Sequence, residues 1–192
     1  ALARLSDDER LHYALYNRGE PQRIEPSFPV ASREINMLMP LLLDAINASE
    51  ALAAGIAAVH FLSTQAGDIL ITLIYSAALR PDWRAAALAM QQQLAIPSLV
   101  GRAKGECVVL GRPYVDEEYR LRDGRTLRYR QVEGSFSNPS AAMAEHTLDW
   151  LCAAAAEMAA EMADKARSGG AAGAAAEGAA AGGAAAGAAP SL

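Results

Sequence analysis

The sequence predicts an α+β fold: an antiparallel β-sheet with packed helices, followed by a long helix and a low-complexity Ala/Gly tail. Three observations carry this prediction. Stretches with apolar residues at helical spacing are interspersed with stretches that alternate like strands. Short turn signals such as Asp123-Gly124 join neighbouring strand-like stretches, which favours antiparallel hairpins. All aromatic residues precede Cys152, so the part that can form a core lies before the alanine-rich end.

These observations divide the chain into three parts. We expect residues 1–137 to form a central domain, residues 138–167 a linking helix, and residues 168–192 a disordered tail or at most a fluctuating helix. That tail holds thirteen Ala and seven Gly in twenty-five positions. Each glycine in a helix costs about 1 kcal/mol relative to alanine, and few side chains in the tail are large enough to pack.

The first elements of the central domain are a hairpin and a helix. Residues 1–17 alternate polar and apolar on both sides of an acidic turn, Ser6 to Glu9, which is typical of a β-hairpin. Residues 23–29, "RIEPSFP", are expected to form a loop bounded by prolines. From Ala31 to Asn47 the apolar residues recur at helical spacing, and Pro40 is expected to kink or interrupt that helix.

The middle of the chain predicts a second hairpin, a helix and two more strands. "VHFLSTQ" and "ILITLIY" flank the turn at residues 66–68, and the second strand is apolar enough to be buried on both faces. The helix within residues 80–94 places Trp83, Ala87, Met90 and Leu94 on one stripe. Short strands are expected around "SLVGRA" and "ECVVLG".

A third hairpin and a long helix follow. In "YRLRDGRTLRYRQ" the Asp123-Gly124 pair suits a tight turn between alternating flanks. Asn138 can then accept a hydrogen bond from a free helix amide, Pro139 fits the first helical position, and the helix is expected to run to about Lys165. Its apolar stripe is Met143, Thr147, Trp150, Leu151, Ala154 and Met158.

Five arginines dominate the third hairpin. The formal net charge of −5 argues against a protein that coats nucleic acid over its whole surface, yet one segment of eleven residues holds a single acid, Asp123, and the arginines Arg120, Arg122, Arg125, Arg128 and Arg130. Strand alternation places Arg120 with Arg122, and Arg128 with Arg130, on common faces, so their guanidinium groups should converge with few acids to neutralise them. Such a surface suits RNA or DNA phosphates. A solvated edge strand protected by charge from aggregation fits the same pattern.

The remaining residues give weaker signals. Tyr75, Tyr114, Tyr119, Tyr129 and Phe61 suit either base stacking or an ordinary core. The three histidines have no carboxylate or cysteine at ligand spacing, so no metal site is expected. Cys107 and Cys152 indicate two free thiols in a reducing compartment, which favours a cytoplasmic or organellar location. No membrane span or glycine-rich nucleotide loop is present, the sequence does not indicate an oligomeric state, and we expect no catalytic residue in this chain.

Several motifs in a fixed order resemble the TrmA-type tRNA (uracil-5-)-methyltransferase family. They are "SFPVASREINMLM", "FLSTQAGDILITLIY" with Trp83 after it, "LVGRAKGE", "YVDEEY" and "YRQVEGSFSNPSAAM" followed by "LDW". The resemblance implies S-adenosyl-L-methionine-dependent methylation of the T-loop uridine, with tRNA as the partner. Residues 1–137 would be the RNA-binding central domain, and residues 138–167 would lead towards a methyltransferase domain missing from this chain.

The resemblance also implies site residues. Phe136 matches the family phenylalanine, and Asn138 stands where the family has a cofactor-contacting glutamine, one methylene longer; Ser140 stands where the family has asparagine. We expect RNA to be bound by Arg120, Arg122, Arg125, Arg128, Tyr129, Arg130 and Gln131. The family's cysteine nucleophile, which adds to uracil C6, belongs to the missing domain, so this chain alone is expected to be inactive.

Two other functions fit the sequence. One is a noncatalytic RNA-binding module derived from this family. The other is a ribosomal-RNA uracil-5-methyltransferase, although those relatives usually carry an extra β-barrel and a cysteine cluster, which this sequence lacks. For the alanine-rich tail we weigh a truncated fragment, a misread gene and an inserted linker.

Overall fold

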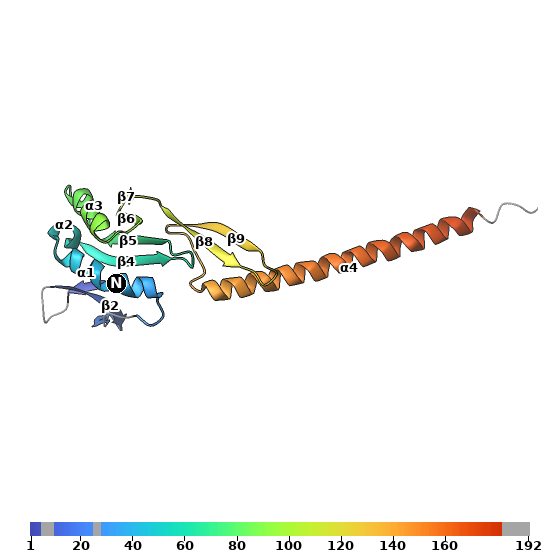
Figure 1. Ribbon diagram of the computed structural model, residues 1–192, viewed down its shortest axis with the longest axis horizontal. Helices are drawn as coiled ribbons and strands as arrows, with labels where there is room; N and C mark the ends of the chain where they lie inside the picture. Colours follow the sequence, from blue (N-terminus) through green and yellow to red (C-terminus); the bar gives the residue numbers. More distant parts are fainter. Residues whose placement is uncertain (5–9, 25–27, 182–192) are drawn as a thin grey trace, which may run out of the picture. The chain divides into compact units, whose positions relative to one another are not determined.

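The computed structural model describes residues 1–4, 10–24 and 28–181, with side chains up to residue 167, and is drawn in Figure 1. It divides into two units, residues 1–141 and residues 142–192. The helices are α1 (Arg33–Asn47), α2 (Glu50–Ala53), α3 (Trp83–Gln93) and α4 (Ala141–Ala181). The strands are β1 (Leu2–Arg4), β2 (Leu11–Asn17), β3 (Glu20–Arg23), β4 (Ile56–Ser63), β5 (Ile69–Tyr75), β6 (Ser98–Ala103), β7 (Glu106–Leu110), β8 (Tyr114–Arg120) and β9 (Thr126–Val132).

The α+β class predicted from the sequence is confirmed. The strands form three sheets, β1-β2-β3, β4-β5-β6-β7 and β8-β9. All three predicted hairpins pair antiparallel, although the acidic turn of the first falls within residues 5–9, outside the described residues. One pair departs from the antiparallel prediction: β5 and β6 are parallel, with α3 as the connection between them. A parallel pair needs such a crossover, so the middle sheet is mixed.

The four-stranded sheet buries both faces, as predicted for β5. Ile71, Leu73 and Tyr75 on one face belong to the main core together with the apolar residues of the three short helices. Leu70, on the opposite face, forms a second cluster with Val115 of β8. The sheet therefore lies between a helical layer and the β8-β9 hairpin.

Trp83 is the largest side chain of the main core. It is 1% exposed and lies with Ala87 and Met90 on the buried side of α3, which confirms the predicted stripe. The tryptophan ring occupies the space above Gly101 of β6: a Cβ atom built there would lie 2.4 Å from the ring. Glycine at position 101 is thus what allows α3 to approach the sheet this closely.

Two local features differ from the prediction. Pro40 does not interrupt helix α1, which runs from Arg33 to Asn47. Residues 20–23 form a third strand, which was not predicted, after a turn in which Arg18 and Gly19 both have positive φ; the loop expected at residues 23–29 therefore begins at Ile24, and its residues 25–27 lie outside the described residues. Arginine is an unusual residue for that conformation, so little in the sequence indicates this turn.

The long helix begins two residues later than the sequence predicts. Helix α4 begins at Ala141, not at Pro139, while the Asn138 side-chain oxygen accepts a hydrogen bond from the Ser140 backbone N–H at 3.0 Å. The helix is described to Ala181, beyond the Lys165 boundary that was expected. Residues 182–192 lie outside the described residues, and disorder of the tail stays a prediction.

Candidate RNA-binding site

A cavity of about 710 Å³ lies within the first unit, where four segments meet. Its walls come from residues 30–32 and 34–35 around the start of α1, and from residues 61–65 and 67 around the β4-β5 turn. Glu117 and Gln131 from the β8-β9 hairpin, and residues 137–139 and 141, complete the lining. A volume of this size is typical of small-molecule and cofactor pockets.

The wall at the start of α1 is fixed by two side chains. Ser32 caps the helix, since its Oγ accepts from the Ile35 backbone N–H at 3.3 Å, and it also contacts the Ser63 hydroxyl at 3.0 Å. The Asn36 Nδ2 group donates to three backbone carbonyls between Phe28 and Ser32, while its Oδ1 accepts from the Phe28 N–H at 2.6 Å. These bonds hold the preceding loop, which would otherwise have few backbone partners.

Glu117 contributes a buried carboxylate to the lining of the cavity. Glu117 is 2% exposed, and its Oε1 accepts from the backbone N–H groups of Gln65 at 3.0 Å and Glu118 at 2.9 Å. Gln131, which is 6% exposed and pairs across the ladder with Val115, donates from Nε2 to the Tyr129 hydroxyl at 2.8 Å. Glu117 thereby ties the β8-β9 hairpin to the β4-β5 turn.

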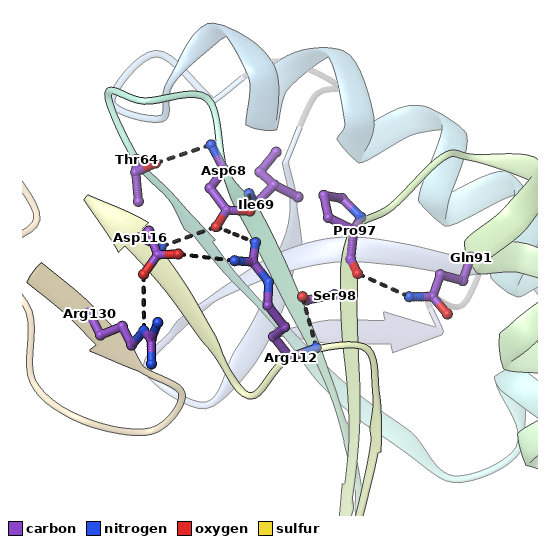
Figure 2. Close-up of polar contacts among 9 residues, drawn as sticks. All are labelled: Thr64, Asp68, Ile69, Gln91, Pro97, Ser98, Arg112, Asp116 and Arg130. Carbon is purple, nitrogen blue, oxygen red and sulfur yellow. Dashed lines mark hydrogen bonds and ion pairs between the residues drawn. The ribbon is translucent and has the colours of Figure 1, made fainter. Parts of the chain in front are cut away.

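Asp68 makes a second tie between the same two elements, shown in Figure 2. Its Oδ2 accepts from Arg112 Nη2 at 2.7 Å and from the Asp116 backbone N–H at 3.1 Å, while Oδ1 accepts from the Ile69 N–H at 3.0 Å. The Asp68 N–H donates to Thr64 Oγ1 at 3.1 Å. The Asp68 side chain is only 14% exposed, so this ion pair is shielded from water better than the others on the hairpin.

The arginines of β9 are neutralised by acids of β8, contrary to the prediction. Arg130 Nε donates to Asp116 at 3.1 Å, and Arg128 Nε donates to Glu118 at 2.6 Å. These are the cross-strand partners in the ladder, which places all four charges on one face. Arg130 also lies over the Tyr114 ring, with its guanidinium carbon 4.2 Å from the ring centroid.

Arg120 shares the face of Arg128 and Arg130 in the ladder, whereas Arg122 and Arg125 lie between the two strands. Arg125 pairs with Asp123 within the turn at 2.7 Å, and Gly124 supplies the positive φ that the Asp-Gly signal predicted. Strand β8 ends at Arg120, so Arg122 lies in the turn rather than beside Arg120 on a strand. The predicted hairpin is therefore confirmed, whereas the predicted concentration of unneutralised positive charge is wrong.

Glu133 anchors the segment that follows β9. Arg102 Nε donates to both carboxylate oxygens of Glu133, at 2.9 and 3.0 Å, and Arg102 Nη2 donates to Oε2. The Thr72 hydroxyl donates to Oε1 at 3.1 Å. The hydrogen bonds from Arg102 hold the pKa of the Glu133 carboxyl below its usual value, against the opposing effect of burial. This contact fixes the start of the stretch that leads to Phe136 and Asn138.

The structure brings together only some of the predicted site residues. Gln131 and Asn138 line the same cavity, while Phe136 is 95% exposed and is not among its lining residues. Tyr129, at 36% exposed, remains accessible. Sequence reasoning missed Glu117; the available signal was a carboxylate at the strand position that alternation assigns to the buried side with Val115.

The other aromatic candidates divide between the two alternatives that the sequence left open. Tyr75 and Tyr119 are each 5% exposed, and Tyr75 belongs to the main core. Phe61 is half-buried and lines the cavity, with its ring centroid 6.4 Å from that of Tyr13. The Tyr114 ring is contacted by two arginines, Arg112 at 5.2 Å and Arg130 at 4.2 Å from its centroid.

Other kinds of site are not found among the described residues. Within residues 1–4, 10–24 and 28–181, no group of three His, Cys, Asp or Glu side chains is placed to hold a metal ion. No helix in the described part of the chain has the length and hydropathy needed to cross a membrane. Cys107, exposed on β7, and Cys152, in α4, are both free thiols.

Comparison with known proteins identifies the class. Residues 2–165 match the sequence model of the family described as tRNA (Uracil-5-)-methyltransferase, and the chain belongs to this family. Curated relatives are the tRNA/tmRNA (uracil-C(5))-methyltransferases of Ectopseudomonas mendocina, 44% identical over 153 residues, and Pseudomonas paraeruginosa, 45% identical over 159 residues. That of Acinetobacter baylyi is 37% identical over 150 residues. The matches cover 79%, 81% and 76% of this chain but 42%, 43% and 41% of the relatives, so the chain spans about two fifths of their length.

Proposed function

We propose that this chain is the RNA-binding part of an S-adenosyl-L-methionine-dependent tRNA (uracil-5-)-methyltransferase that methylates the T-loop uridine. The observation that carries the proposal is the family match over residues 2–165. The relatives act on tRNA and tmRNA according to their names, which supports tRNA as the partner. The two free thiols are in keeping with a cytoplasmic location, which belongs to the same proposal.

The exposed arginine pairs can bind phosphate despite their carboxylate partners. Arg128 and Arg130 have side chains 78% and 61% exposed. Ion pairs in such exposed positions contribute roughly 0.2–1 kcal/mol, because water screens them. An RNA phosphate can therefore replace Glu118 or Asp116 as the partner at little cost, and its oxygens match the guanidinium geometry.

The position of Asn138 in the lining of the first cavity supports a contact between this residue and the cofactor. Asn138 Oδ1 accepts from the Ser140 N–H, its Nδ2 has no hydrogen-bond partner among the described residues, and the exposed side chain lines the cavity. When bound, S-adenosyl-L-methionine supplies the methyl group. In this proposal Asn138 would hold one polar group of it, while the nucleophile and most of the cofactor site lie in residues outside this chain.

Binding and methylation can be measured separately on the same chain. Unmodified tRNA transcript is titrated into the protein by fluorescence anisotropy, and transfer of labelled methyl from S-adenosyl-L-methionine is followed in parallel. We expect salt-sensitive binding without methyl transfer, since the phosphate contacts are electrostatic and the resemblance assigns the thiolate to the missing domain. Absence of tRNA binding by the folded chain would contradict the first part of the proposal, and turnover would contradict the second.

Replacing both β9 arginines tests the phosphate contacts. We expect Arg128→Ala/Arg130→Ala to weaken tRNA binding and to make the slope of log affinity against log salt shallower by about 1.4–1.8, the equivalent of two phosphates. The matched control is Arg10→Ala/Arg80→Ala, which removes two other exposed arginines that pair with Asp44 and Asp82. If both double variants changed the slope equally, the β9 arginines would have no particular role in binding.

A further inference from the structure

Two buried side chains present hydrogen-bond acceptors to the cavity. Glu117 Oε1 accepts hydrogen bonds from two backbone N–H groups, those of Gln65 and Glu118. Gln131 Nε2 donates to the Tyr129 hydroxyl. Within the described part of the chain, Glu117 Oε2 and Gln131 Oε1 have no hydrogen-bond partner. Among the described residues, every side-chain oxygen or nitrogen that is fully shielded from solvent has a hydrogen-bond partner. Because Glu117 Oε2 and Gln131 Oε1 have none, these two atoms are not fully shielded.

Both residues line the cavity of about 710 Å³, which is the open space that they have in common, and Glu117 also borders a second cavity. Glu117 and Gln131 are 98% and 94% buried, being 2% and 6% exposed, so little bulk water competes for them. A carboxylate oxygen and an amide oxygen of buried side chains that have no hydrogen-bond partner are unfavourable until a donor arrives. The cavity is therefore built to receive a ligand that offers N–H groups.

The nucleobases differ in how they meet this requirement. Guanine carries two neighbouring donors, N1–H and the N2 amino group, on its Watson–Crick edge. Adenine and cytosine each place one amino group beside a ring-nitrogen acceptor, and uracil places one N–H between two carbonyl oxygens that a carboxylate repels. Unpaired bases are commonly recognised through these edges.

We infer that this cavity is a guanine pocket for an unpaired nucleotide of the bound RNA, with Glu117 and Gln131 as the residues that read its Watson–Crick edge. The inference rests on the proposed function, because it takes the ligand to be RNA. Phe61 in the same wall offers an aromatic surface for the base. The carboxylates of Glu34 and Glu117 exclude phosphate from the cavity, so the base enters and the backbone remains outside.

The phosphate contacts lie next to this pocket. A second cavity, of about 670 Å³, shares Glu117 with the first and is lined also by Ala66, Tyr129 and the ion pairs Arg128–Glu118 and Arg130–Asp116, whose exposed arginines an RNA phosphate can contact in place of the acids. Strand alternation in the hairpin places the phosphate-binding arginines on one face and the base-reading residues, Glu117 and Gln131, on the other. A nucleotide can place its phosphate at the arginines while its base reaches Glu117.

Short oligonucleotides test the pocket directly. Binding of the labelled pentaribonucleotides UUGUU, UUIUU and UUUUU, where I is inosine, is measured by fluorescence anisotropy on the full 192-residue chain. We expect UUGUU to bind about tenfold tighter than UUUUU, and UUIUU to fall between them, since inosine lacks only the N2 amino group.

A pair of adjacent substitutions provides the matched control. Glu117→Gln keeps the size and one acceptor of the side chain but loses the carboxylate, so we expect the tenfold preference to disappear while binding of UUUUU is retained. Glu118→Gln, one residue along on the opposite face, should leave the ratio between UUGUU and UUUUU unchanged. Circular dichroism melting of each variant checks that the fold is intact, and Gln131→Leu gives a second test should Glu117→Gln unfold.

The outcomes separate the pocket from the proposed function. Equal binding of the three pentanucleotides, or a preference that survives both Glu117→Gln and Gln131→Leu, overturns the guanine pocket even when tRNA binds. Failure of tRNA and all pentanucleotides to bind overturns the proposed function and the pocket together. Loss of the preference in Glu117→Gln or Gln131→Leu, with the ratio intact in Glu118→Gln, supports the pocket.

Discussion

Trp83→Ala should lower the free energy of unfolding by about 3–5 kcal/mol, the usual cost of removing a buried tryptophan from a core. The indole is 1% exposed, and its Nε1 donates to the Tyr75 hydroxyl at 2.8 Å; that hydroxyl in turn donates to the Leu52 carbonyl at 2.9 Å. The two rings meet edge to face with centroids 6.2 Å apart. Truncation therefore leaves a cavity and removes one donor from a buried chain of hydrogen bonds.

The chain contains one other tryptophan, which supplies the control. Trp150 in α4 is 67% exposed, so Trp150→Ala should change the free energy of unfolding by no more than about 0.5 kcal/mol. Urea unfolding followed by circular dichroism measures both variants without relying on tryptophan fluorescence. Equal effects of the two substitutions would mean that Trp83 does not anchor α3 to the sheet.

The same contact affects the Tyr75 phenol. Burial raises the pKa of Tyr75 to about 12, with a smaller opposing effect from the Trp83 hydrogen bond. The phenol therefore stays protonated, and available as a donor to Leu52, across the whole physiological range.

Glu133→Gln should lower the free energy of unfolding at pH 7 by about 1–3 kcal/mol, because it removes the charge that accepts the Arg102 hydrogen bonds. The Glu133 side chain is 8% exposed and that of Arg102 is 44% exposed. Water screens the arginine end, so a value in the lower half of that range is expected. The control is Glu106→Gln on the exposed surface of β7, which should be close to neutral.

The pH dependence of this effect has a definite sign. Since the folded state holds the Glu133 pKa below its ordinary value of 4.5, the contact stabilises the protein above that value and loses its contribution as the pH falls through the folded-state pKa. We expect urea unfolding to show a steeper loss of stability below about pH 4.5 in the wild type than in Glu133→Gln. Parallel curves for the two proteins would contradict the assignment.

Local sequence determined much of this fold. Helices α1 and α3 follow from apolar spacing, and the three predicted hairpins follow from alternation around turn residues, because these signals act between residues close in the chain. Their order also carried the family resemblance, which the comparison confirmed. The same local signals could not show that β5 and β6 pair in parallel, because nothing in one strand specifies the direction of its neighbour.

Tertiary structure decided the site. The sequence showed five arginines and one acid between residues 120 and 130, but the acids that neutralise Arg128 and Arg130 lie on β8, and only the ladder register brings them together. Glu117 stood in a polar stretch, and its burial depends on the β4-β5 turn, 52 positions away along the chain, closing over it. A cavity walled by four distant segments is a property of how they pack, because each segment supplies only part of the surface.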